Sequence, residues 1–392
     1  MQYFEYYTPT RVVFGKDTES QVGKLVKDQG AKKVLIHYGG GSVIRSGLLF
    51  RVEEALRAEG IDYVLLGGAV PNPRLSKVYE GIDLCKKEGV DFVLAVGGGS
   101  TIDSAKGIAY GIANEGDVWD FYLKKRQPSA CAPLGVVLTM AATGSEMSDS
   151  SVVTNEEGWL KRSAKSNLSR PKFAILNPQL TYTLPEYQTM CGCVDIMMHT
   201  MERYFDNNPG LALTDSIAEG LIKTVMKNAV ILKDNPQDYE ARAEVMWASS
   251  LSHNGLTGCG GKGGDWVCHK MEHELGGMFD VTHGAGLAAV WGSWARYVYK
   301  DCMDRFTKFA VNVMGIEAGG DADAVILAGI QAMEDFFCSI DMPVTIRELG
   351  VDPTEEQVKE MAAKCYVANG GPKGTAKLLV EEDLYQIYKA AL

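Results

Sequence analysis

Histidine and long apolar runs are both scarce in this chain of 392 residues. It contains six histidines, and five of them fall between His199 and His283. The longest uncharged stretch, residues 127–145, contains two prolines and is a poor candidate for a membrane span. The N-terminus has no cationic start followed by an apolar core, so we expect no signal peptide. The clustered histidines are therefore the first indication of a functional site.

Basic residues are also in the minority, with 39 Lys and Arg against 50 Asp and Glu and a net charge of −11. Nucleic acids and anionic membranes are bound by clustered Lys and Arg, so we expect neither as a partner. Nine cysteines at irregular positions do not indicate a disulfide framework in a chain of this length. We expect reduced thiols in a cytoplasmic protein.

The two halves of the sequence follow different patterns. In the first half, short apolar runs that end near glycines alternate with helical segments, which is typical of a parallel sheet covered on both faces. From about residue 185, segments with a helical period follow one another. We expect an α/β Rossmann-like domain over residues 1–183 and an all-helical domain over 184–392. The expected strands are 11–15, 34–38, 63–66, 92–96 and 134–138, and the expected helices are 18–29, 46–59, 75–88, 186–206, 211–232, 238–257, 264–276, 283–298, 301–315, 321–340 and 355–367.

Glycine-rich turns follow two of the expected strands. Gly97, Gly98 and Gly99 with Ser100 lie between a strand and a helix, where glycine lets a phosphate approach the backbone N–H groups. The alternative is a tight turn in which Ser100 caps the helix. The earlier turn, residues 39–42, has no acid to hold the ribose 2′-hydroxyl of NAD, whereas Ser42 and Arg45 can donate hydrogen bonds. We therefore expect NADP(H) in preference to NAD(H).

A third polar turn follows strand 134–138 and contains Thr139, Thr143 and Ser145. These hydroxyls are placed to contact the nicotinamide or the pyrophosphate. Alternatively, the two threonines only satisfy the polar groups of a buried loop.

The clustered histidines have the spacing of metal ligands. Asp195 and His199 are four residues apart on one helical face, His269 and His273 repeat this spacing, and His283 follows. One carboxylate and three imidazoles suit Fe(II) or Zn(II) with positions open for substrate. A single helical histidine is usually structural, but two such pairs in a histidine-poor chain favour a metal site.

A rival interpretation comes from the same segment. His269, Glu272 and His273 match H-x-x-E-H, a metalloprotease pattern in which both histidines bind zinc and the glutamate acts as base. That interpretation leaves the glycine turns and the pair of Asp195 and His199 unexplained.

Four motifs in this order make the chain resemble the iron-containing (group III) alcohol dehydrogenases, nearest to the branch of butanol dehydrogenases and NADPH-dependent aldehyde reductases. They are Gly97-Gly98-Gly99-Ser100-x-x-Asp103, Ala142-Thr143-Gly144-Ser145-Glu146, Gly192-x-x-Asp195-x-x-x-His199 and His269-x-x-x-His273-x₉-His283-Gly284. Two positions depart from the family pattern, since Asn177 replaces a usual Asp and Ala142 a common Gly.

The resemblance implies a dehydroquinate synthase-like architecture, a homodimer and a role for each motif residue. The metal ligands would be Asp195, His199, His269 and His283, and His273 would lie unligated near the nicotinamide and the substrate. The implied cofactor-binding residues are Gly39, Gly40, Ser42, Asn72, Gly97, Gly98, Gly99, Ser100, Asp103, Thr139, Thr143, Ser145 and Lys161.

The reaction implied is hydride transfer between the nicotinamide and a small aliphatic aldehyde or alcohol, with a divalent metal, Fe(II) before Zn(II), polarising the carbonyl oxygen. His273 would either relay a proton or only shape the pocket. A lyase resembling dehydroquinate synthase needs several cations around a phosphorylated substrate, and only Lys262 and Lys270 lie between His253 and His283. A role in metal storage or structure would leave the glycine turns unused.

Overall fold

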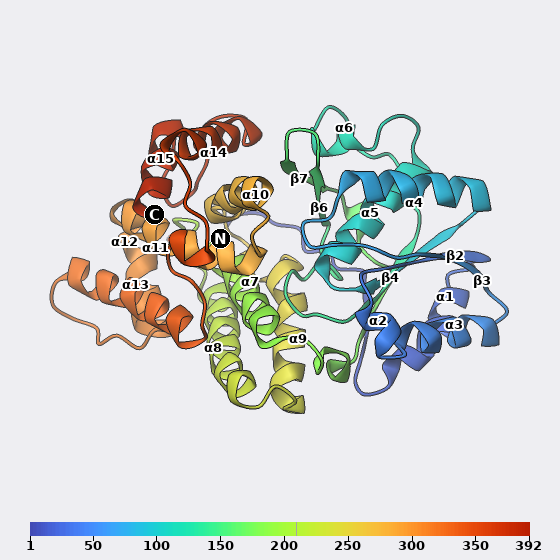
Figure 1. The fold of residues 1–392 in the computed structure, drawn as a ribbon. Coiled ribbons are helices and arrows are strands. Elements are labelled where there is room, and N and C mark those ends of the chain that lie inside the picture. Colours follow the sequence, from blue (N-terminus) through green and yellow to red (C-terminus); the bar gives the residue numbers. More distant parts are fainter. Residues whose placement is uncertain (209) are drawn as a thin grey trace. The chain divides into compact units, whose positions relative to one another are not determined.

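A computed structural model describes residues 1–208 and 210–392 and divides the chain into two compact units (Figure 1). The α/β unit consists of Tyr7–Leu184, and the helical unit consists of Pro185–Leu392 together with Met1–Tyr6. The sequence prediction had placed this N-terminal segment with the α/β half. It instead packs in the helical unit, where the N–H of Gln2 donates to the carbonyl oxygen of Gly260 at 2.9 Å.

The α/β unit is built on a parallel sheet of six strands in the order β1-β8-β5-β4-β2-β3. This confirms the predicted fold class. The strands are β1 (Arg11–Phe14), β2 (Lys33–Tyr38), β3 (Asp62–Leu66), β4 (Phe92–Gly97), β5 (Leu134–Leu138) and β8 (Phe173–Leu176).

Helices cover both faces of this sheet, which is why its central strands are apolar along their length. On β2, Val34 and Ile36 pack in one core with α1 (Val22–Lys27) and α3 (Leu48–Ala58). The opposite face lies against α4 (Leu75–Glu88) and α5 (Gly99–Ala113) (Figure 1). His37 faces that side, where its ring nitrogens hydrogen-bond to the carbonyl oxygen of Leu66 and to Ser104 Oγ. The one histidine of the α/β unit is thus a satisfied core residue.

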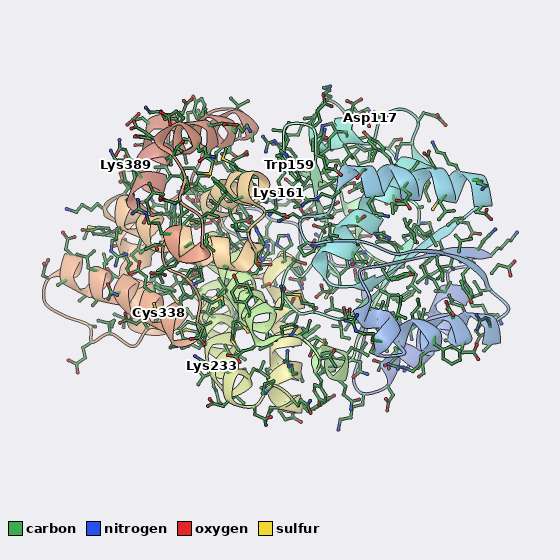
Figure 2. The ribbon with its side chains drawn as sticks, in the orientation of Figure 1. Asp117, Trp159, Lys161, Lys233, Cys338 and Lys389 are labelled. Carbon is green, nitrogen blue, oxygen red and sulfur yellow. The ribbon has the colours of Figure 1, made fainter. Side chains whose placement is uncertain are left out.

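The sequence prediction missed an antiparallel hairpin of β6 (Ser150–Asn155) and β7 (Leu160–Lys165). The sequence of β7, Leu-Lys-Arg-Ser-Ala-Lys, carries three cations and gives no apolar run to find. Trp159 and Lys161 lie at this hairpin (Figure 2). The remaining short elements of the unit are η1 (Thr18–Gln21), α2 (Ser42–Arg45), α6 (Trp119–Tyr122), η2 (Asn167–Ser169) and η3 (Pro178–Thr181).

The second unit is helical, as predicted. The expected helix over 301–315 is broken into α12 (Met303–Lys308) and a π-helical turn, η6 (Phe309–Val313), and the last helix, α15 (Glu381–Ala390), was not predicted. None of the described helices is long and apolar enough to cross a membrane. The elements are α7 (Glu186–Tyr204), α8 (Ala212–Asp234), α9 (Tyr239–His253), η4 (Leu256–Gly258), α10 (Val267–Phe279), α11 (His283–Val298), η5 (Tyr299–Asp301), α12 (Met303–Lys308), η6 (Phe309–Val313), α13 (Ala322–Ser339), η7 (Arg347–Leu349), α14 (Glu355–Ala368) and α15 (Glu381–Ala390).

Candidate functional site

The predicted metal ligands come together inside the helical unit, from three helices. Asp195 and His199 lie one turn apart on α7 and are 2% and 5% exposed. Nδ1 of His199 lies 3.1 Å from Oδ1 of Asp195 and also hydrogen-bonds to the carbonyl oxygen of Asp195 at 2.9 Å. Nε2 of His269, from α10, lies 3.6 Å from the same Oδ1.

The start of α11 brings in the fourth residue. Nε2 of His283 lies 3.6 Å from Oδ1 of Asp195. The next residue, Gly284, packs so closely on α7 that a Cβ there would lie 2.0 Å from the carbonyl oxygen of Cys191. Only glycine permits this approach, and it brings the N-terminal end of α11 against the helix that carries Asp195.

Two buried glutamates hold the outer nitrogens of these imidazoles. Oε1 of Glu202 accepts hydrogen bonds from Nδ1 of His269 at 3.0 Å and from the His269 backbone N–H at 2.9 Å. Oε2 of Glu272 accepts from Nδ1 of His283. Because a carboxylate only accepts, Nδ1 is the donor in each ring, and Nε2 lies on the side of Asp195, 3.6 Å from its Oδ1. Such carboxylate–histidine pairs are the usual support for a histidine that binds a metal.

The residues fit a divalent ion on their own chemistry. Oδ1 of Asp195 and Nε2 of His269 are buried and have no hydrogen-bond partner among the described residues. Ligand atoms of Asp195, His199 and His269 can lie within 4.8 Å of one another. Ligands about 2.1 Å from a tetrahedral ion lie roughly 3.4 Å apart, close to the spacing observed around Asp195.

The charged groups of this cluster shift one another's pKa values. Burial by itself would raise the pKa of Asp195, but the imidazoles of His199 and His283 hold it well below its usual range. Burial lowers the pKa of His199 to about 4 against the opposing effect of Asp195. Burial also acts to lower the pKa of His269, yet the carboxylates of Asp195 and Glu202 raise it overall. The site thus combines one carboxylate with imidazoles, the mixture that Fe(II) and Zn(II) accept.

The geometry does not suit the metalloprotease alternative. That mechanism needs Glu272 as a base beside a metal bound by His269 and His273. Glu272 instead is completely buried and accepts a hydrogen bond from His283. His273 is 6% exposed, with its ring centroid 6.1 Å from that of His283.

The three polar turns predicted to bind a dinucleotide lie along one edge of the α/β sheet. Val96 of β4 pairs with Tyr38 of β2, and Gly97 pairs with Leu138 of β5, so the turns after all three strands start side by side. The chain passes from β2 to β3 on one side and returns to β4 on the other. Such a switch point at the carboxyl ends of parallel strands is where ligands bind in open α/β sheets.

The glycine turn after β4 packs closely against the side chains of Thr143 and Met140. Gly98, and not Ser100, is the N-cap of α5, with no side-chain hydrogen bond to the first turn. This does not fit the alternative in which Ser100 served as the cap. A Cβ on Gly99 would lie 2.4 Å from side-chain atoms of Thr143, and one on Gly98 would lie 3.1 Å from Cβ of Met140. Glycine at these two positions therefore avoids clashes with Thr143 and Met140 and places no side chain of its own beside the backbone N–H groups at the start of α5.

Some of the other predicted cofactor residues are exposed at this edge of the sheet, and others make hydrogen bonds that hold its turns in place. Gly40 and Ser42 are exposed on the turn after β2, and Gly39 accepts a hydrogen bond from the N–H of Gly68. Thr143 Oγ1 accepts from the N–H of Ser145, so this hydroxyl does brace the loop. Thr139 follows β5 and donates its N–H to the carbonyl oxygen of Gly97.

Asp103, Asn72 and Lys161 are buried. Asp103 accepts hydrogen bonds from Ser145 Oγ at 2.6 Å and from the N–H of Val152 at 2.9 Å, so it ties α5 to the third turn and to β6. Asn72 has a left-handed backbone with φ 50°. Lys161 lies on β7, 4% exposed and paired in register with Thr154 (Figure 2).

Asn177, the first departure from the family pattern, has a structural reason. Its Nδ2 donates to Oε2 of Glu19 at 2.8 Å, and both residues are buried. An aspartate here would place a second carboxylate against Glu19. Nothing in the structure explains the second departure, Ala142.

Sequence reasoning missed the supporting residues Glu202 and Lys106, and it left His253 without a role. Glu202 lies three residues after His199 on α7, so helical spacing from a proposed ligand could have found it. Lys106 is completely buried on α5 among serine oxygens. The ring of His253 lies 4.1 Å from that of His199, and its Nδ1 lies 3.2 Å from Nη2 of Arg203.

Two models of known protein families match this chain, one in each half. A family model described as "Iron-containing alcohol dehydrogenase" matches residues 9–178, and one described as "Fe-containing alcohol dehydrogenase family, C-terminal" matches residues 189–392. The chain belongs to the iron-containing alcohol dehydrogenase family. Members use a divalent metal and a nicotinamide cofactor, so the chain is a metal-dependent alcohol dehydrogenase or aldehyde reductase.

Within this family, three similar proteins span nearly all of the chain. The "NADH-dependent butanol dehydrogenase A" of Clostridium acetobutylicum is 39% identical, over 98% of each chain. The "NADPH-dependent aldehyde reductase YqhD" of Escherichia coli is 34% identical, over 90% of each chain. The crystal structure of an "NADH-dependent butanol dehydrogenase A" from Thermotoga maritima has a TM-score of 0.96 and 39% identity, covering 100% of this chain and 99% of that one.

Proposed function

We propose that the chain catalyses reversible hydride transfer between NADP(H) and a small aliphatic aldehyde or alcohol, with Fe(II) or, failing that, Zn(II) held by Asp195, His199, His269 and His283. The observation that carries the proposal is the meeting of these side chains around Oδ1 of Asp195, with Nε2 of both His269 and His283 at 3.6 Å. The printed names of two relatives, a butanol dehydrogenase and an aldehyde reductase, support the class of substrate.

When bound, the nicotinamide supplies or accepts the hydride and the divalent ion polarises the carbonyl oxygen as a Lewis acid. The chain's own contribution is to fix the side chains that would bind the metal in the orientation needed for binding. Glu202 and Glu272 fix the rings of His269 and His283 so that the rings need not reorient. The N–H groups at the start of α5, where no side chain caps the helix, would offer hydrogen bonds to a pyrophosphate.

His273 is proposed to relay the proton that the alcohol oxygen gains or loses. It lies one turn after His269 on α10, in the same cluster of rings. A histidine can exchange protons near neutral pH, which the neighbouring carboxylates cannot do as readily. The variant His273→Gln keeps a hydrogen-bonding side chain without this titration. We expect it to bind metal normally, to lose most of its kcat and to show a flattened pH–rate profile. An unchanged pH profile would leave His273 with a role in pocket shape only.

The preference for NADP(H) rests on the turn after β2. No acid lies between Tyr38 and Leu49, and the guanidinium of Arg45 folds over the turn, since a Cβ on Gly41 would lie 2.5 Å from its Nη1. A cation there suits a 2′-phosphate. The butanol dehydrogenases among the relatives are named as NADH-dependent, so the test must compare both cofactors.

The deciding experiment measures oxidation of NADPH and of NADH by protein of known metal content, with unbranched aldehydes of two to six carbons. We expect consumption of NADPH in proportion to aldehyde, highest kcat/KM for NADPH, and loss of activity when the metal is removed. No net oxidation of either cofactor would overturn the proposal, because a lyase that recycles its nicotinamide behaves in that way. The homodimer and the cytoplasmic location stay predictions, to be checked by light scattering and by fractionation.

A further inference from the structure

Lys106 is the most enclosed cation of the α/β unit. It lies on α5, seven residues after Gly99, and its side chain is 0% exposed. An unpaired ammonium buried in this way is expensive, so its surroundings must stabilise the charge.

Five oxygens of three serines surround its Nζ. The carbonyl oxygens of Ser145, Ser148 and Ser150 lie at 2.8, 3.0 and 2.7 Å, and Oγ of Ser145 and of Ser148 lie at 3.0 and 3.3 Å. An ammonium has only three protons to donate, so this is more oxygen than a lysine requires. Shells of carbonyl oxygens of this kind replace the water around monovalent ions such as K⁺. The distances are longer than the roughly 2.3–2.6 Å of calcium sites.

Through Ser145, Lys106 holds the third polar turn, which follows β5 and lies beside the glycine turn after β4. Ser145 donates its N–H to Oγ1 of Thr143 at 3.1 Å, and Thr143 is the side chain that a Cβ on Gly99 would strike. Ser145 Oγ also donates to Oδ1 of Asp103, one helical turn before Lys106. Two residues of α5 therefore fix the third turn against the start of their own helix.

The charged groups around Lys106 act at longer range. Burial lowers the pKa of its ammonium to about 8, while Asp103, Asp149 and Glu146 favour the charged form and Arg170 opposes it. The atoms in contact with Nζ are neutral carbonyls and hydroxyls, the oxygens that an inorganic monovalent cation would also accept.

We propose that the Lys106 ammonium serves as a tethered monovalent cation that orders the turn Thr143–Ser145 against Gly99, and that it is a positioning residue for the nicotinamide cofactor. The inference rests on the proposed function, because it assigns this sheet edge to the dinucleotide. The inference adds Lys106 to the cofactor site as a residue that contacts only protein atoms. It also predicts that a free ammonium or potassium ion can replace the Lys106 side chain.

The test is chemical rescue of cofactor binding. In Lys106→Ala the oxygens stay and the ammonium is removed, whereas in Lys106→Met an apolar chain fills the same space. In tetramethylammonium chloride we expect both variants to bind NADP(H), measured by nucleotide fluorescence, about ten- to a hundredfold more weakly than the wild type, since buried oxygens lose their donors. Ammonium or potassium chloride at the same ionic strength restores affinity in Lys106→Ala and not in Lys106→Met. Lys86→Ala, which alters an exposed lysine of α4, is the surface control.

Each outcome decides a separate point. If the wild type binds neither nucleotide, the proposed function fails. If the wild type binds and Lys106→Ala binds equally well, or if ammonium rescues both variants alike, the inference fails. If Lys106→Ala folds only in ammonium or potassium, as judged by circular dichroism, the cation role is supported. If it folds in neither salt, Lys106→Gln decides: undiminished affinity in this neutral, similarly sized variant overturns the inference, and a loss of about tenfold or more supports it.

Discussion

Glu202 and Glu272, which hydrogen-bond to two of the proposed metal ligands, give the most direct quantitative test of the site. Replacing Glu202 or Glu272 by glutamine preserves shape and an acceptor oxygen but removes the charge that strengthens the hydrogen bond to the imidazole. Loss of such a supporting carboxylate typically costs ten- to a hundredfold in metal affinity, about 1.4–2.8 kcal/mol. The loss of metal affinity should differ between the two variants, because solvent screens the pair of Glu272 and His283 more than the pair of Glu202 and His269.

Exposure sets the order of the two effects. The side chains of Glu202 and His269 are 1% and 6% exposed, and Glu202 accepts two hydrogen bonds from the same residue. The side chains of Glu272 and His283 are 0% and 25% exposed. We therefore expect Glu202→Gln near the hundredfold end and Glu272→Gln near the tenfold end of the range.

The assay is anaerobic competition between apoprotein and a chelator for Fe(II) or Zn(II), followed by kcat at saturating metal. Glu219→Gln is a matched control, since Glu219 accepts hydrogen bonds from Tyr204 and Asn312 in the same unit. Affinity should fall in both test variants, and most of kcat should return with excess metal. If Glu272→Gln bound metal normally but had no activity at any metal concentration, Glu272 would be a catalytic base and the assignment made here would be wrong.

Three further predictions concern the histidine cluster of the helical unit and the sheet edge of the α/β unit. His199→Ala should lose bound metal and turnover together. A variant that kept its metal and reduced butanal at a normal rate would contradict the ligand assignment. Gly99→Ala should destabilise the protein by about 1–3 kcal/mol in urea unfolding, because its Cβ meets Thr143 at 2.4 Å, whereas Gly40→Ala, with nothing within 4 Å, should be neutral. Burial lowers the pKa of Lys106 from its ordinary 10.5 to about 8 in the folded protein, so between these pH values the unfolded chain binds more protons and the stability contributed by this group rises with pH. Relative to Lys106→Met, the wild type should gain up to about 3 kcal/mol in free energy of unfolding between pH 7.5 and 10.5, and parallel pH profiles would refute this.

Local pattern predicted much of the fold. The expected bounds of α4, β5 and α11 agree with the structure to the residue, and local signals mark several of them: α4 ends before Gly89, β5 begins after Pro133 and α11 begins after Thr282. The prediction failed where tertiary contacts decide. The strand β7 forms through pairing with β6 despite its three cations, and the helix expected over 301–315 changes to a π-helical turn at Phe309.

The site was predictable as far as short-range spacing reaches. One helical turn separates Asp195 from His199, and the sequence shows this directly. The hydrogen bond between Glu272 and His283 depends on the packing of α10 beside α11, and the oxygens around Lys106 depend on a turn some 40 residues away. Neither arrangement leaves a periodic signal in the chain, so only the structure distinguishes a supporting glutamate from the base of a protease.

The contact between Gln2 and Gly260 bears on how the protein is made. The helical unit includes Met1–Tyr6 but otherwise starts at Pro185, so it is discontinuous in the chain, whereas the α/β unit is one uninterrupted segment. On the ribosome the α/β unit can complete its sheet while the helical unit still awaits synthesis. The segment Met1–Tyr6 can form its contact with Gly260 only after residue 260 has emerged, just before the helix that carries His269. We therefore expect the histidine cluster to assemble late in biosynthesis, after the α/β unit has already folded.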